Sequence, residues 1–371
     1  MSPANVNCMQ SAPDQGVVLS IQHLRCVAAM LVVWHHATGQ IAAIDTEFGA
    51  NGVDLFFVIS GFVMVATTAG RHTQPATFMK RRLLRVVPLY WMLTAAMVWV
   101  ALMVPGTFSS LVIEGDTFFK SLLFIPHFSA SFPDRVLPLL APGWTLNLEM
   151  YFYLVFGLSL MLPEAHRLPA LMLFFVASAA MGWVFGPFAT AIGQTYTSPM
   201  LLEFVAGALT ARAWLSGRLN VSTRLSAAAV VLGFVSLLFV DMGADGLGQL
   251  VGASLIVIGA LNKTFAGWRH GLLQRLGDAS YSIYLTHLFT LGALRVTWNQ
   301  LVPAGPSLIV DWLFLGLALV ACAAVGYASY LCLERPLLAK LAAGRRIERP
   351  AQSTGFEDRS GRITSRCPRV P

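Results

Sequence analysis

The segment LRCVAAMLVVWHH, residues 24–36, places an arginine and two histidines at the ends of nine apolar residues. In a helix that turns about 100° per residue, His36 lies within about 20° of the face that carries Arg25 and roughly 16 Å further along the axis. An ionisable group inside a membrane span costs roughly 3 kcal/mol or more, so it indicates a functional site by default. The alternative is that Arg25 and His36 reach the headgroups at opposite membrane surfaces.

The composition supports a membrane location for this segment. Of the 371 residues, 56% are hydrophobic and 12% are charged, and the mean hydropathy is +0.66. Soluble domains carry about 25% charged residues, so the chain is predicted to be a polytopic membrane protein. The net charge of +7 favours basic cytoplasmic loops over nucleic-acid binding.

The cysteine spacing and the N-terminal residues argue against cysteine-based sites and against a signal peptide. The five cysteines show no paired spacing, so neither a disulfide framework nor a metal site is predicted. The first sixteen residues contain no Lys or Arg and therefore lack the basic region of a signal peptide. We expect the first span to be retained.

Apolar segments long enough to cross a bilayer of about 30 Å recur along the chain. They predict an all-α integral membrane protein, a bundle of about ten transmembrane helices, near residues 18–40, 50–70, 86–105, 143–162, 168–187, 198–216, 225–241, 246–262, 279–299 and 308–333. Arg and Lys concentrate in alternate loops, which places both termini in the cytoplasm. We expect a cytoplasmic N-terminus over 1–17, a transmembrane domain over 18–340, and a disordered Arg-rich cytoplasmic tail over 341–371. Residues 106–142 form a long outer loop without an obvious element of its own.

Two motifs follow the first span. GVDLFFVISGFVM (52–64) brings Asp54 into the membrane near the expected depth of His36, where a carboxylate can orient an imidazole, although capping of the helix N-terminus is an equal alternative. Gly61 is interpreted as a helix-packing residue. FMKRRLLRVVPLYW (78–91) carries an arginine cluster suited to a phosphate-bearing cosubstrate or to anionic lipid headgroups, namely Arg81, Arg82 and Arg85.

Later spans carry further polar residues. In PGWTLNLEMYFY (142–153), Trp144 marks the outer membrane boundary. Glu149 lies about two helical turns further into the membrane, with Tyr153 on the same face. Glu149 needs an interior partner, and a structural ion pair with an arginine is the alternative to a catalytic role.

Two more motifs lie near the end of the chain. In LGDASYSIYLTH (276–287), Ser280, Tyr284 and His287 form one polar stripe, and a hydrogen-bonded core histidine is the alternative for His287. Glu203 in LLEFVAG is expected to join an outer acidic cluster. Glu334, in the closing LERPLLAK, is interpreted as one member of a surface ion pair at a helix end.

Taken in order, these motifs resemble the acyltransferase 3 family of bacterial membrane-bound O-acyltransferases. The matching pieces span residues 20–338 and are LRCVAAMLVVWHH, GVDLFFVISGFV, RRLLRVVPLYW, GWTLNLEMYFYL, LGDASYSIYLTH and ERPL. The LLEFVAG segment is similar to the ExoZ-like, exopolysaccharide-modifying branch. The chain departs from the family pattern at Thr145, usually serine, and at Gln22-His23, usually Asp-Gly.

The resemblance implies a bacterial inner-membrane enzyme that moves an acyl group, usually acetyl from acetyl-CoA, onto a surface carbohydrate. It implies acyl-CoA as cosubstrate, no tightly bound cofactor or metal, and as partners the carbohydrate acceptor, the lipid bilayer and polysaccharide-assembly proteins. Together with the residues themselves it gives His36, Glu149 and Asp54 as catalytic candidates. The substrate- or CoA-binding candidates are Arg25, Arg81, Arg82, Arg85, Trp144, Tyr284 and His287.

One mechanism joins these assignments. His36 acts as general base on an acceptor hydroxyl, Asp54 or Glu149 orients it, and the arginines bind the CoA phosphates. A covalent acyl-histidine relay is a variant of this mechanism. The alternative function is a transporter or flippase for an anionic or lipid-linked substrate, with the buried ionisable residues as a proton relay. A purely structural subunit of an assembly complex fits these residues poorly.

Overall fold

The computed structural model describes residues 19–41, 48–104, 108, 111–219, 221–239, 246–262, 271–302 and 307–347. Within these ranges the regular structure is helical, apart from one isolated bridge between Phe128 and Val136. The predicted N-terminal segment 1–17 lies outside the described residues. The predicted tail does so only from residue 348, because α15 (Arg335–Ile347) extends into it. The disorder expected of the tail stays a prediction.

Each of the ten predicted apolar segments coincides with a helix. These helices are α1 (Leu19–Thr38), α2 (Gly52–Thr68), α3 (Pro75–Met103), α5 (Trp144–Ser159), α6 (Glu164–Phe185), α8 (Leu201–Leu215), α9 (Thr223–Phe239), α10 (Leu247–Ala260), α13 (Ser280–Leu301) and α14 (Leu308–Ser329). Shorter elements connect them: η1 (Phe48–Asn51), α4 (Gly115–Leu122), η2 (Ala141–Gly143), α7 (Ala191–Tyr196), α12 (Gly271–Asp278) and η3 (Tyr330–Glu334).

Fewer than ten of these helices are both long enough and apolar enough to be candidate membrane spans. Among the described residues, four are long and apolar enough to cross a bilayer: Phe48–Thr68, Pro75–Met103, Glu164–Phe185 and Leu308–Leu341. Two shorter apolar helices are α9 and α10. The protein is thus an all-helical membrane protein, and the count of ten spans stays a prediction. Several of the remaining helices, α1, α8 and α13 among them, are those that carry buried polar residues.

Close packing of α2 against α8 holds the centre of the bundle together. A Cβ atom added at Gly61 would lie 1.9 Å from the carbonyl oxygen of Phe204, and one at Gly207 would lie 1.9 Å from that of Val58. Only glycine allows the two backbones to approach so closely, which confirms the predicted packing role of Gly61 and gives Gly207 the same role. Beside this contact the ring of Phe204 stacks on Phe57 at 4.6 Å.

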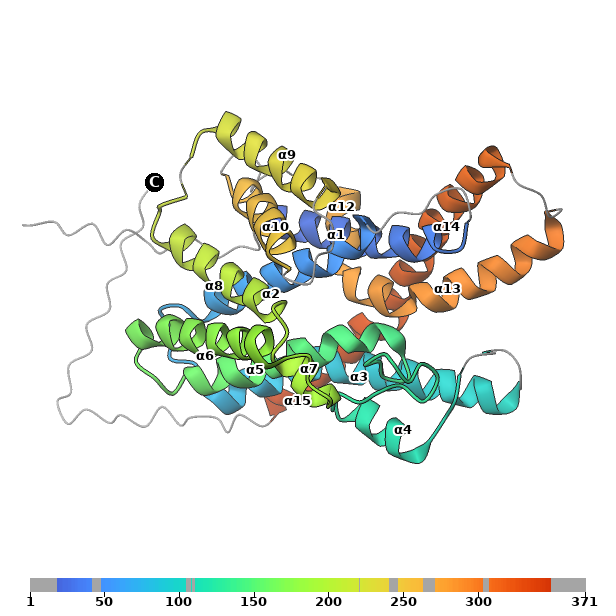
Figure 1. Cartoon of the computed structure of the whole chain (residues 1–371), viewed down its shortest axis with the longest axis horizontal. Coiled ribbons are helices and arrows are strands. Elements are labelled where there is room, and N and C mark those ends of the chain that lie inside the picture. The colour runs from blue at the N-terminus through green and yellow to red at the C-terminus, as the bar shows by residue number, and fades with distance from the viewer. Residues whose placement is uncertain are drawn as a thin grey trace, which may run out of the picture.

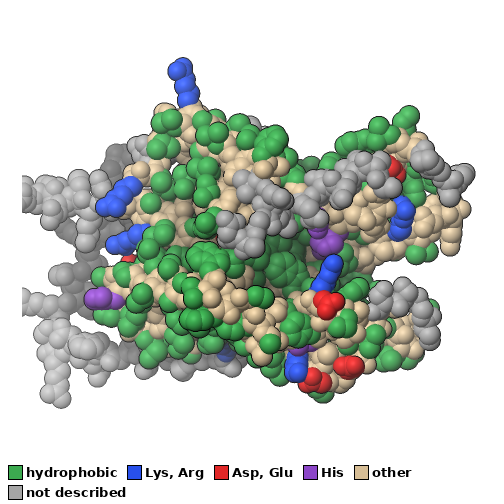
Figure 2. Space-filling model, in the orientation of Figure 1, with side chains coloured by type: hydrophobic (Ala, Val, Ile, Leu, Met, Phe, Trp, Pro, Cys, Tyr) green, Lys and Arg blue, Asp and Glu red, His purple; other side chains and the backbone are tan. Residues whose placement is uncertain are grey.

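The helix α1 lies in the interior and contacts α2, α10, α12, α13 and α14. Figure 1 shows α1 and α2 between α9 and α10 on one side and α5 and α6 on the other. Figure 2 shows that the visible surface is largely hydrophobic over these helices, with few charged side chains. Leu173 and Phe185 on α6, for instance, are 74% and 71% exposed. Such a surface suits helices whose outer faces contact lipid.

The outer loop has structure of its own, contrary to the sequence expectation. It contains α4, the bridge between Phe128 and Val136, and the turn η2 that leads into α5. The indole Nε1 of Trp91 on α3 donates to the carbonyl oxygen of Leu122 at 2.8 Å, which ties α4 to α3. The loop is therefore a folded cover over one part of the bundle.

Candidate functional site

A cavity of about 120 Å³ lies where α1, α2, α3, α5 and α13 meet. We call it the arginine cavity. The polar residues of its lining come from all five helices: Arg25, Ser60, Arg82, Arg85, Thr145, Glu149, Tyr153, Tyr281 and Tyr284. Residues that the sequence scatters over more than 250 positions are thus brought to one place.

Glu149 is the carboxylate of this cavity. Its Oε1 accepts a hydrogen bond from Ser60 Oγ at 3.1 Å and another from the hydroxyl of Tyr153. It also interacts electrostatically with Arg25 and Arg82. The predicted interior partners of Glu149, including Tyr153 at i+4, are confirmed. The structure therefore pairs Glu149 with hydroxyls and arginines.

The cations of the cavity are Arg25, Arg82 and Arg85. The guanidinium of Arg82 lies 5.4 Å from the ring centre of Phe78 and 5.8 Å from that of Tyr153, so aromatic faces hold it in position. Arg25 interacts electrostatically with Arg85 as well as with Glu149. Arg81, predicted to belong to the cluster, is exposed and is not part of the cavity lining. Three arginines grouped around few carboxylates favour an anionic ligand.

Glu334 is a residue of this region that sequence reasoning missed. It was expected in a surface ion pair, but it is 1% exposed and its Oε2 accepts from Ser282 Oγ at 2.6 Å. It interacts electrostatically with Arg85 and Arg25. Glu334 ends the π-helical turn η3, and such a turn shifts the face on which a side chain lies. The burial of Glu334 makes the predicted surface position wrong. The sequence contains no pattern that predicts the π-helical turn.

The two histidines of the motifs meet near the C-terminal end of α1. The rings of His36 and His287 lie with their centres 4.8 Å apart, at 62° to each other. His36 Nδ1 lies 2.9 Å from the carbonyl oxygen of Val32, and His287 Nδ1 lies 2.6 Å from that of Tyr284. A carbonyl only accepts, so in each neutral ring Nδ1 carries the hydrogen and Nε2 keeps its lone pair. His287 is fully buried, and its Nε2 has no hydrogen-bond partner among the described residues.

Asp54 was predicted to orient His36, but its side-chain contact is with Glu203. Its side chain bonds to that of Glu203, and the two residues are 6% and 2% exposed. The two buried carboxyl groups therefore lie together across the α2–α8 contact. The orientation of His36 comes from the backbone of Val32 rather than from Asp54.

Tyr284 connects the cavity to the histidine pair. Its hydroxyl lies 2.9 Å from Thr145 Oγ1 and donates to the carbonyl oxygen of Pro142 at 3.1 Å. Its own backbone carbonyl accepts from His287, and its ring lies 5.9 Å from that histidine. Trp144, predicted to bind substrate, is half-buried in the hydrophobic core and is not part of the cavity lining.

Comparison with known proteins identifies the family. Residues 18–331 match the family described as "Acyltransferase domain". The chain belongs to the acyltransferase 3 family. It is 38% identical over 306 residues to the exopolysaccharide production protein ExoZ of Rhizobium meliloti (strain 1021), covering 80% of this chain and 92% of that protein.

Two further relatives of this acyltransferase carry transferase names. The putative membrane-bound transacylase BcsY of Komagataeibacter xylinus is 30% identical over 72% of this chain and 71% of its own length. The acyltransferase MdmB of Streptomyces mycarofaciens is 27% identical over 73% of this chain and 78% of its own length. No solved structure matches the chain.

Membership of the acyltransferase 3 family decides between the functions that the sequence left open. The chain is an acyltransferase, so this function is favoured over the transporter hypothesis. The match covers the arginine cavity and both histidines, whereas Glu334 lies three residues beyond its end.

Proposed function

We propose that this acyltransferase moves an acetyl group from acetyl-CoA to a hydroxyl of a surface or exported carbohydrate. The name of the relative ExoZ, an exopolysaccharide production protein, supports a carbohydrate acceptor. The relatives named above are bacterial proteins, and we place this chain in a bacterial inner membrane, with ten spanning helices and both termini in the cytoplasm. Acyl-CoA is consumed as a cosubstrate rather than held as a cofactor, and polysaccharide-assembly proteins are the proposed partners.

The arginine cavity is the proposed donor site. Guanidinium groups bind phosphate oxygens through paired hydrogen bonds, and Arg82 and Arg85 stand one turn apart on α3. Arg25 extends this positive region toward α1. At about 120 Å³ the cavity holds only a small part of a CoA molecule, so most of the donor lies outside it.

The observation that carries the chemical proposal is the pairing of His36 with His287. Because Nδ1 of His36 is committed to Val32, its Nε2 is free to take the proton of an acceptor hydroxyl. The hydroxyl oxygen then bonds to the carbonyl carbon of the thioester, the carbon–sulfur bond breaks, and the proton leaves on the CoA thiol. General-base catalysis of this kind contributes about 10²–10⁴-fold. His287 packs on the imidazole and restricts its orientation.

The test uses permeabilised membrane vesicles that contain the wild-type protein, labelled acetyl-CoA, and carbohydrate or lipid-linked oligosaccharide from the native host. We expect His36→Ala to lower label transfer by about 10²-fold or more. The matched control is His166→Ala, because His166 is an exposed histidine at the start of α6. Normal transfer by a folded His36→Ala protein overturns the mechanism, and no transfer by wild type, with acceptor present and other short acyl-CoAs tried, overturns the proposed function.

A covalent relay remains the variant of this mechanism, and the same vesicles separate the two. In the relay, His36 Nε2 itself bonds to the acyl carbon, and the acceptor hydroxyl displaces it in a second step. Label bound to wild type, but not to His36→Ala, in the absence of acceptor indicates the relay. Protein without label under those conditions, together with normal transfer once acceptor is added, supports direct transfer.

A further inference from the structure

A second cavity lies under the folded outer loop. It has a volume of about 320 Å³, within the range of roughly 300–1,000 Å³ that is typical of small-molecule sites. We call it the outer pocket. The residues of its lining that carry the following argument are Phe108, His127, Ser129, Ser131, Phe132 and Phe289.

The lining of the outer pocket includes residues next in sequence to one histidine of the pair. Phe289 and Leu288, both in its lining, directly follow His287 on α13. On the opposite side, Leu140 and Ala141 precede Pro142, whose carbonyl oxygen holds the hydroxyl of Tyr284. Residues close together in sequence, at η2 and the start of α5 and along α13, therefore line either the outer pocket or the arginine cavity.

The described residues of its lining include no Asp, Glu, Lys or Arg. The charged pair of α4, Lys120 with Asp116 at 2.5 Å, lies outside that lining. Phosphates of a CoA donor find no cation here, in contrast to the arginine cavity. The uncharged lining therefore favours a neutral ligand.

Hydroxyl and imidazole groups of the pocket keep unused hydrogen-bonding capacity. Ser129 Oγ accepts from the backbone N–H groups of Ser131 and Phe132, and Ser131 Oγ accepts from that of Val112. Both hydroxyls therefore retain a hydrogen to donate. Such donors bind the oxygen atoms of a polyhydroxylated ligand.

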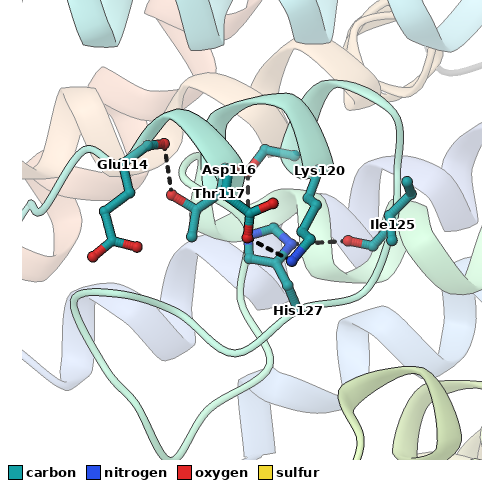
Figure 3. A network of polar contacts seen from close by, with 7 residues as sticks. Glu114, Asp116, Thr117, Lys120, Ile125 and His127 are labelled. Atoms are coloured by element: carbon teal, nitrogen blue, oxygen red, sulfur yellow. Dashed lines mark hydrogen bonds and ion pairs between the residues drawn. The ribbon is translucent and has the colours of Figure 1, made fainter.

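His127 supplies the complementary acceptor. It is 7% exposed and lies beside α4 (Figure 3), and its Nδ1 is 2.8 Å from the carbonyl oxygen of Ile125, so Nδ1 carries the hydrogen of the neutral ring. Its Nε2 lies 3.5 Å from Ser121 Oγ, whose single hydrogen is donated to the carbonyl oxygen of Thr117 at 2.7 Å. The Nε2 lone pair is thus free to accept from a ligand hydroxyl.

Aromatic side chains complete the pocket. Phe289 meets Phe108 with ring centres 6.3 Å apart, and Phe132, 47% exposed, stands at the edge of the lining. A sugar ring has an apolar face of C–H groups, which packs on aromatic side chains, and a rim of hydroxyls, which need hydrogen-bonding partners. The outer pocket offers both kinds of group.

We propose that the outer pocket binds the acceptor as a neutral sugar ring, which packs its C–H face on Phe132 and Phe289 and bonds its hydroxyls to His127, Ser129 and Ser131. The inference rests on the proposed function, because it assigns the acceptor of that reaction to a site. It separates the two substrates: the charged donor enters the arginine cavity, and the uncharged acceptor enters from the outer loop.

The test compares Phe132→Ala with the matched control Phe119→Ala. Phe119 is an exposed phenylalanine of the same loop, 64% exposed, and is not part of the pocket lining. The probe is a set of neutral oligosaccharides, released from the exopolysaccharide of the native host and de-O-acylated with mild base, in permeabilised vesicles with labelled acetyl-CoA. We expect Phe132→Ala to raise the KM for the oligosaccharide about tenfold and to leave the KM for acetyl-CoA unchanged. Phe119→Ala changes neither.

A second pair of variants tests the acceptor atom of His127. Asn places an N–H near the position of Nδ1 and removes the Nε2 position, whereas Gln reaches the Nε2 position. We expect His127→Asn to raise the KM for the oligosaccharide and His127→Gln to recover part of the loss. Equal amounts of each variant in the membrane, with an unchanged KM for acetyl-CoA, establish that the variant is folded and keeps its donor site.

A lipid extract of the same host, offered in place of the oligosaccharides, distinguishes a lipid-linked sugar from a free one, since both present the same ring to the pocket. Transfer by wild type to either probe, with the acceptor KM unchanged in Phe132→Ala and His127→Asn, overturns the pocket assignment and leaves the proposed function standing. A raised KM for acetyl-CoA in Phe132→Ala also overturns it. No transfer by wild type to either probe overturns the proposed function itself.

Discussion

The arginine cavity and the outer pocket differ in charge, although neighbouring residues of the chain contribute to both linings. The arginine cavity holds three guanidinium groups and Glu149, whereas the described lining of the outer pocket is uncharged. An acyl-CoA is a polyanion and a sugar ring is neutral, so the two cavities suit the two substrates that we propose for the transfer reaction. The difference in lining charge is therefore the feature by which the proposed donor and acceptor sites can be told apart.

Beyond His36 itself, the largest effect is expected at His287, which lies at this meeting point. His287→Asn keeps an N–H for the carbonyl oxygen of Tyr284 but removes the ring that packs on His36. We expect kcat to fall up to about a hundredfold, because small misplacements of a reacting group have effects of that size, while both KM values change little. Steady-state kinetics with each substrate varied in turn provides the measurement. A raised KM for one substrate, with kcat intact, would instead assign His287 to that substrate's site.

The second prediction concerns the donor side alone. Arg82→Ala removes a guanidinium that Phe78 and Tyr153 hold in place, and the KM for acetyl-CoA is expected to rise about tenfold, the effect of losing one hydrogen bond to a charged group. The KM for the sugar acceptor stays constant. Arg81→Ala serves as control, because it removes the same charge from an exposed neighbouring position. Equal effects of the two substitutions would mean that general surface charge, and not the cavity, binds the donor.

The two cavities also differ in how much of them the sequence reveals. Arg25 and Glu149 are conspicuous in the sequence because each is a charged residue within an apolar segment, and Arg82 because it belongs to an arginine cluster. The structure brings all three together. The helices themselves follow from hydropathy, and each predicted segment coincides with one. The outer pocket is built from Phe, Ser and Leu of an irregular loop, residue types that form no pattern until the loop is folded.

Other failures have equally local causes. A carboxylate was expected to orient His36, but the carbonyl of Val32, one helical turn away, does so, and every helix offers such a carbonyl. Asp54 bonds to Glu203 because α2 and α8 pack closely at their glycines, a tertiary contact that no single segment encodes. Glu334 is buried through the π-helical turn η3, which the sequence does not announce.

The third prediction tests whether Glu334 stabilises the arginines of the cavity. Glu334→Gln keeps an oxygen for Ser282 Oγ but removes the negative charge that faces Arg85 and Arg25. Because a hydrogen bond to an ionised group is about twice as strong as a neutral one, we expect a loss of roughly 1 kcal/mol in stability. Thermal unfolding of the purified protein in detergent measures it. Glu164→Gln is the control, since Glu164 is half exposed in a surface ion pair with Arg212. A Glu334→Gln protein as stable as the control would show that Glu334 does not stabilise the arginines.

The smallest expected effect follows from charge alone and requires no substitution. Salt at about 0.1 M screens charges over roughly 10 Å, so raising the ionic strength weakens the attraction between the arginines and CoA phosphates. We expect the KM for acetyl-CoA to rise about twofold between low and physiological salt, with the KM for the oligosaccharide unchanged. Repeating the titration with Arg82→Ala sharpens the comparison, because a donor site with one cation fewer has a shallower salt dependence. If the KM for the sugar also rises with salt, the acceptor is bound through charge, and the outer pocket, whose described lining has no charged residue, is not the site that binds it.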